Sequence, residues 1–123
     1  MNVEIRPSSF LVMEIPIAGW KDRILFFLGR REAFRVEGNS MTPNLNDGDV
    51  VLVKPTRRIK VGDVVLAKHP YKQSLKVLKR VSEINEQGRF ELTGDNADES
   101  TDSRTFGSIS SADVLGKVIG RLR

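Results

Sequence analysis

The pattern of apolar and polar residues changes once along the chain, near residue 33. Between residues 20 and 30, apolar residues recur at the spacing of an α-helix and are separated by charged ones. The apolar positions are Trp20, Ile24, Phe27 and Leu28. This pattern predicts one amphipathic helix that ends at Gly29 and packs on the domain. Residues 8–17 are predicted to be extended and to form either a sheet edge or a lead-in to the sheet, because Pro16 cannot donate to a strand ladder.

From residue 33 onward, the apolar residues are mainly β-branched and come in short runs. Two runs, 48–54 and 62–68, nearly repeat one another, and each begins with a Gly-Asp turn. Further strands are predicted at 33–36, 74–84, 89–93 and 114–122. Short strands joined by glycine-rich turns predict a mainly β fold, a small and strongly bent antiparallel sheet or partial barrel. We therefore expect an N-terminal extension, 1–32, followed by a β core, 33–123.

Composition narrows the kinds of site that the chain can hold. It has 123 residues, 39% of them hydrophobic, which is enough for one domain with one core. With no cysteine and a single histidine, His69, the chain offers too few soft ligands for a thiolate or zinc site, so we expect no metal and no cofactor.

Charge and hydropathy limit the kinds of partner that the chain is expected to bind. The net charge of +4 is scattered, which argues against nucleic acid as a partner but allows a weak membrane-surface contact through residues 20–30. No apolar run reaches the roughly 20 residues of a transmembrane span. No secretory signal is recognisable either, so we expect a cytoplasmic protein.

A glycine-led turn carries a candidate nucleophile. The turn is Gly38-Asn39-Ser40-Met41-Thr42-Pro43, between the strand predicted at 33–36 and an acidic turn at 46–49. We interpret Ser40 as the nucleophile. Because His69 completes a Ser-His-Asp triad only if the fold brings it to Ser40, a lysine is the more suitable base.

Strand parity selects Lys79 as that base. Side chains alternate across a strand, so Lys79 shares its face with apolar residues, whereas Arg80 is predicted to lie on the wetter face. The apolar residues on the face of Lys79 are Leu75, Val77 and Val81. Such neighbours are expected to lower the pKa of the lysine from its reference value of about 10.4, so that a neutral amine can take the serine proton. The alternative is an edge lysine whose stem covers apolar surface while its head reaches water.

Three sequence elements, taken in order, resemble the signal peptidase I type of serine protease. They are Gly-x-Ser-Met-x-Pro at 38–43, Val-Leu-Lys-Arg-Val at 77–81 and Gly-Asp-Asn-x-x-x-Ser-x-Asp-Ser-Arg-x-Phe-Gly at 94–107. The resemblance covers residues 34–120. It implies that residues 33–123 are a peptidase core with a Ser-Lys dyad, on the β fold of signal peptidases and of the C-terminal domain of LexA.

The resemblance gives a role to each matching residue. Ser40 is the implied nucleophile, Lys79 its general base, and Ser100 the residue that orients the lysine amine. The backbone N–H of Ser40 supplies one oxyanion donor. Some members have a serine as second donor where this chain has Gly38, and Asn39 is a candidate to replace it. The residues implied to support the site are Met41, Pro43, Asp95 and Asn96, together with Asp102 and Arg104 as a structural charged pair.

The compact core is similar to that of one soluble subgroup. Membrane-anchored signal peptidases begin with a transmembrane helix and often carry a large insertion after the lysine strand, and neither is recognisable here. Small soluble members remove a short N-terminal propeptide from nickel-type superoxide dismutase, so the resemblance implies such a precursor as the partner. The substrate is expected to add as a strand along an edge near residues 36–40 and 72–78.

Three other functions stay open on the sequence alone. A self-cleaving protein of the LexA and UmuD type would cut itself at Ala18-Gly19, upstream of Ser40. A membrane-associated signal peptidase would dock through residues 20–30. A non-catalytic binding module would keep Ser40 and Lys79 only as structural polar groups.

Overall fold

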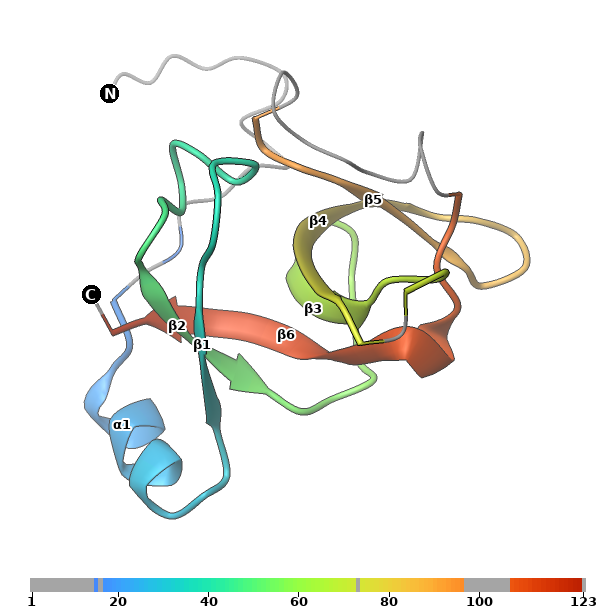
Figure 1. Cartoon of the computed structure of the whole chain (residues 1–123). Helices are drawn as coiled ribbons and strands as arrows, with labels where there is room; N and C mark the ends of the chain where they lie inside the picture. Colours follow the sequence, from blue (N-terminus) through green and yellow to red (C-terminus); the bar gives the residue numbers. More distant parts are fainter. Residues whose placement is uncertain (1–14, 16, 73, 97–106, 123) are drawn as a thin grey trace.

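The computed structural model describes residues 15, 17–72, 74–96 and 107–122 of the chain (Figure 1). Within these residues the elements are, in chain order, α1 (Trp20–Phe27), β1 (Glu32–Arg35), β2 (Val50–Lys54), β3 (Val64–Lys68), β4 (Lys76–Ile84), β5 (Phe90–Thr93), the short 3-10 helix η3 (Ser111–Asp113) and β6 (Val114–Arg121).

The described strands form a single sheet in the order β1-β2-β6-β3-β4-β5, and every neighbouring pair is antiparallel. The sheet does not close, so β1 and β5 are its edges. The register shifts once in three of the pairs, β2 with β6, β3 with β6 and β4 with β5. Such irregularities bend and twist a sheet, and Figure 1 shows the strong curvature of β4. The predicted fold class, a bent antiparallel sheet with one N-terminal helix, is confirmed.

The two near-repeats of the sequence become β2 and β3, which lie on either side of β6. A glycine with positive φ turns the chain before each strand, Gly48 at 92° and Gly62 at 98°. In both turns the following aspartate, Asp49 or Asp63, accepts a 2.8 Å hydrogen bond from the backbone N–H three residues before it. The repeated Gly-Asp pair therefore encodes the same turn twice.

The core consists of two apolar clusters that share β3. Val64 and Leu66 belong to one cluster, and Val65 and Ala67 belong to the other. Because side chains alternate across a strand, β3 is buried on both faces, as its unbroken apolar run indicates.

The prediction that Arg80 lies on a wet face of β4 is wrong. Arg80 is 4% exposed and its neighbour Leu78 is also buried, whereas Leu75, assigned to the core face, is exposed. The middle of β4 has the two clusters on its two sides, with Leu78 in one and Val81 in the other. Strand parity predicts which residues share a face of a strand, but it does not predict whether that face is exposed to water.

Three of the four residues that define the apolar pattern of α1 are exposed. Trp20, Ile24 and Leu28 are 68%, 49% and 68% exposed, and the partly buried residues are Asp22, Leu25 and Phe26. The helix does end as predicted, before Gly29 with its φ of 78°. No helix in the described part of the chain is long and apolar enough to cross a membrane.

The chain just before α1 is attached to the end of β6. Ile17 forms a parallel bridge with Arg121, and the N–H of Ala18 donates to the Arg121 carbonyl at 2.9 Å. Ala18 is 6% exposed and packs on Gly120, where a Cβ atom would meet the Cα of Ala18 at 2.9 Å. Most of the strand predicted at 8–17 lies outside the described residues.

Candidate active site

The turn that carries Ser40 follows β1 and is anchored at both ends. Gly38, at a φ of 85°, donates its N–H to the Asp47 carboxylate at 2.8 Å. Met41 and Leu45 are fully buried, and the N–H of Leu45 donates to the Met41 carbonyl at 2.9 Å. The peptide bond before Pro43 is cis. Buried apolar anchors on its C-terminal side thus fix the turn against the core.

Asn96, just beyond β5, ties this turn from outside. Its backbone N–H donates to the Ser40 carbonyl at 2.8 Å. Its side-chain amide donates to the Asn39 carbonyl at 3.1 Å and to the Thr42 hydroxyl at 2.9 Å. Three hydrogen bonds from one residue hold the backbone on both sides of Ser40.

Asp95 connects the same turn to β4. Its carboxylate accepts from Arg80 Nε and Nη2, both at 2.9 Å, and from the Asn44 side chain at 2.8 Å. Arg80 also donates to the Gly62 carbonyl at 2.7 Å. The Arg80 and Asp95 side chains are only 5% and 3% exposed, so the pair is a bidentate ion pair inside the protein.

Sequence reasoning missed Arg80 and Asn44 as parts of the site. A partial signal was present, because Arg80 on one predicted strand and Asp95, just after the next predicted strand, have opposite charges, but it does not reveal that the pair is buried. A buried charge needs such a partner.

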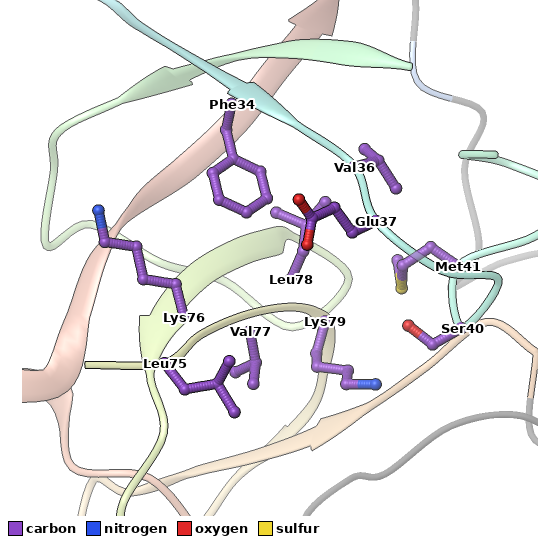
Figure 2. A pocket seen from close by; sticks show the side chains of 10 residues that line it. All are labelled: Phe34, Val36, Glu37, Ser40, Met41, Leu75, Lys76, Val77, Leu78 and Lys79. Carbon is purple, nitrogen blue, oxygen red and sulfur yellow. The ribbon is translucent and has the colours of Figure 1, made fainter. Parts of the chain in front are cut away.

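Ser40 and Lys79 line one pocket of about 230 Å³. Figure 2 shows the hydroxyl of Ser40 and the amine of Lys79 at the same end of this pocket. Lys79 is 5% exposed, although its amine is polar. The rest of the lining comes from the region around the end of β1, the Ser40 turn and the start of β4. Most of these residues are apolar, and Glu37 contributes a carboxylate. They are Phe34, Val36, Glu37, Met41, Leu75, Lys76, Val77 and Leu78.

The other predicted residues fall into three groups. Gly38, Asn39 and Pro43 lie in the exposed part of the turn, and Met41 lies under it. Asp95 and Asn96 brace the turn, as described above. Ser100, Asp102 and Arg104 lie outside the described residues, so their roles stay predictions.

His69 is not among the residues that line the pocket with Ser40. It lies just after β3, and its Nδ1 accepts the N–H groups of Tyr71 and Lys72 at 3.1 and 3.2 Å. No group of three or more potential metal ligands occurs among the residues that the structure describes.

Comparison with known proteins adds an independent finding. The sequence model of the family described as Peptidase S24-like matches residues 29–119. The chain is 32% identical to mitochondrial inner membrane protease subunit 1 of Xenopus tropicalis, over 69% of this chain and 65% of that protein. It is 33% identical to mitochondrial ATP-independent inner membrane protease subunit 1a of Arabidopsis thaliana, over 71% of this chain and 67% of that protein.

The chain thus spans about two thirds of the length of both relatives. The matches support the signal-peptidase-like superfamily that the sequence motifs indicate. The narrower subgroup that matures superoxide dismutase and the cytoplasmic location stay predictions.

Proposed function

Because the chain belongs to the Peptidase S24-like family, we propose that it is a serine endopeptidase in which Ser40 is the nucleophile and Lys79 the general base. The observation that carries this proposal is the geometry of the pocket. Two residues from separate elements place a hydroxyl and an amine at the same end of one mainly apolar pocket (Figure 2). Burial among apolar side chains disfavours the charged form of an amine, which suits Lys79 to accept a proton.

In the proposed reaction, Lys79 takes the hydroxyl proton as Ser40 Oγ attacks the scissile carbonyl. The negative charge that develops on the carbonyl oxygen is stabilised by the backbone N–H of Ser40, which donates to none of the other described residues, and by a second donor for which Asn39 is the candidate. Lys79 then gives the proton to the leaving amine, the C–N bond breaks, and an acyl-enzyme forms on Ser40. Finally, Lys79 activates the water that hydrolyses this ester. Ser100 is proposed to orient the Lys79 amine.

The shape of the site suits an extended peptide as the substrate. The pocket lies between the end of β1, an edge strand, and the start of β4. An extended chain can add to such an edge through main-chain hydrogen bonds, while the pocket accepts a small apolar side chain. We propose that this peptide is the N-terminal leader or propeptide of a precursor protein.

The precursor of nickel-type superoxide dismutase is our specific candidate. Its support is the resemblance to the compact soluble subgroup, together with the short hairpin between β4 and β5, in which the Asn85 N–H donates to the Arg89 carbonyl at 2.9 Å. The names of the two relatives suggest a membrane-associated protease as the alternative.

Self-cleavage at Ala18-Gly19 is less compatible with the fold. Ala18 is buried against β6, and the Gly19 carbonyl accepts the Arg23 N–H at 3.1 Å inside α1. Neither residue lines the pocket with Ser40. The segment would have to leave the end of β6 before its peptide bond could reach the nucleophile.

The test uses the purified protein, a library of unstructured peptides and mass spectrometry of the products. Ser40→Ala and Lys79→Met should each lower kcat/KM on the order of 10³-fold or more, because a nucleophile and its base act as a unit. For the wild type, kcat/KM should fall as the pH is lowered, since a protonated amine cannot accept a proton.

Two substitutions serve as matched controls. Lys54 is an exposed lysine of β2 and Ser82 an exposed serine of β4, and neither lines the pocket, so Lys54→Met and Ser82→Ala should stay close to wild type. A folded wild-type protein that cleaves no peptide, or a fully active Ser40→Ala variant, would contradict the proposal. Co-expression with a nickel superoxide dismutase precursor tests the narrower substrate: an untrimmed precursor beside active peptide cleavage would remove only that candidate.

A further inference from the structure

The exposed side of α1 carries a row of apolar residues. Trp20, Ile24 and Leu28 follow one another at intervals of four residues, close to one helical turn, and Ile17 precedes them. All four are at least 49% exposed, with Ile17 at 55%. The side chains of Leu25 and Phe26, on the opposite side, are partly buried. We call Ile17, Trp20, Ile24 and Leu28 the α1 face.

Cations flank the α1 face. Lys21 and Arg23 project on its two sides, because they lie one and three residues after Trp20 on the helix. The Lys21 amine lies 5.6 Å from the centre of the Trp20 ring, and Arg30 follows the end of the helix. From residue 17 to residue 35 there are five basic residues and two acidic ones, and one of the acids, Asp22, is paired with Arg31. The surroundings of the face are therefore positive.

We propose that the α1 face docks on an anionic membrane surface. A helix with apolar and aromatic residues on one side and basic residues at its flanks lies in the plane of a lipid interface. Trp20, Ile24 and Leu28 enter the boundary between headgroups and acyl chains, while Lys21, Arg23 and Arg30 contact lipid phosphates. At eight residues, α1 is about 12 Å long, so it lies on the surface and does not span it.

A second copy of the chain is a less suitable occupant. In a symmetric dimer the same patch meets itself, so the positive flanks of the two α1 faces would lie against each other. An anionic lipid surface instead supplies the opposite charge to every flank. The proposal does not depend on the peptidase reaction, because none of the four residues lines the pocket with Ser40.

Trp20 makes the test direct, because it is the only tryptophan of the chain. Its fluorescence is measured with vesicles of phosphatidylcholine alone and with vesicles that also contain phosphatidylglycerol. We expect a blue shift and co-sedimentation with the anionic vesicles, much weaker effects with the neutral ones, and loss of binding as salt is raised. An unshifted spectrum with both kinds of vesicle would overturn the proposal. So would an emission already typical of a buried indole without vesicles, because another part of the chain or a second copy would then cover the face.

A matched pair of variants distinguishes vesicle binding through the α1 face from binding that depends only on net charge. Ile24→Glu places a carboxylate in the α1 face, and Ile84→Glu makes the same change at the end of β4, where Ile84 is 37% exposed. Ile24→Glu should weaken vesicle binding about tenfold or more, and Ile84→Glu should weaken it far less. Equal losses of vesicle binding in the two variants would show that overall charge controls binding and would refute docking through α1. Peptide cleavage in solution should be unchanged in Ile24→Glu, so failure of this proposal is distinguishable from failure of the peptidase function.

Discussion

Glu37 adds a carboxylate to a pocket that is lined mainly by apolar residues. It is the last residue before the Ser40 turn, and among the described lining residues it is the one with a carboxylate. Figure 2 shows its side chain extending along the wall toward Phe34. A peptide that lies beside the end of β1 must therefore pass a negative charge at the edge of an apolar surface.

We expect Glu37 to favour substrates with a basic side chain near the cleaved bond. Glu37→Gln keeps the shape and removes the charge, so it should lower kcat/KM for a lysine-containing peptide by about fivefold, and leave the matching norleucine peptide unchanged. The peptides carry the lysine at successive positions before the cleaved bond, and the cleavage rates are compared. Glu83→Gln, at an exposed site of β4, is the control. The same loss for lysine and norleucine peptides would show that Glu37 does not select charge.

At the scale of elements, β4 and the end of β5 act together on the turn after β1. Asp95 binds Arg80 on β4 and Asn44 beyond the turn, and Asn96 binds the backbone around Ser40. The strand that carries Lys79 and the turn that carries Ser40 are thus joined through one buried carboxylate.

Asp95→Asn should therefore damage both stability and catalysis. It removes the negative charge that accepts two hydrogen bonds from the buried Arg80 guanidinium, which costs about 3–5 kcal/mol of unfolding free energy. Urea unfolding measures this loss, and kcat at saturating peptide measures the effect on the Ser40 turn. Asp22→Asn is the matched control, because its ion pair with Arg31 is longer, at 3.4 Å, and more exposed, so it should cost less than about 1 kcal/mol. Similar losses in the two variants would refute a special role for the buried pair.

The elements also show what a single sequence can and cannot predict. The strands were predictable because their signal is local: a glycine that turns, an aspartate that caps the turn, and a run of β-branched residues. The pairing of Ser40 with Lys79 followed from strand parity and from the order of the motifs. The burial of Arg80 and the exposure of Trp20 were not predictable, because each depends on what packs against the element from a distant part of the chain.

At the scale of the whole molecule, the first and last described elements are joined. Ile17 and Ala18 pair with Arg121 at the end of β6, and Gly120 leaves room for Ala18. This junction places α1 beside the C-terminal end of the chain, as Figure 1 shows. The Ala18-Gly19 bond is held there in folded structure.

We therefore expect the purified chain to stay intact when it is incubated alone at mildly alkaline pH. Mass spectrometry of the whole protein over time measures this. Conversion to a fragment that begins at Gly19, absent in Ser40→Ala, would contradict the prediction and favour self-cleavage. A variant with Gly120→Val, in which the added side chain pushes Ala18 away, tests whether the junction provides the protection.

The hydrogen bonds that Asn96 makes to the Ser40 turn bear on when, during synthesis and folding, the chain can become reactive. The proposed nucleophile, its base and the residue that braces the nucleophile's turn come from three separate stretches of sequence, and the last of these is synthesised well after the first. A ribosome-bound or partly denatured chain therefore holds an ordinary serine and an ordinary, hydrated lysine. We therefore expect such a chain to lack the proposed peptidase activity, which would develop only once the tertiary structure is complete.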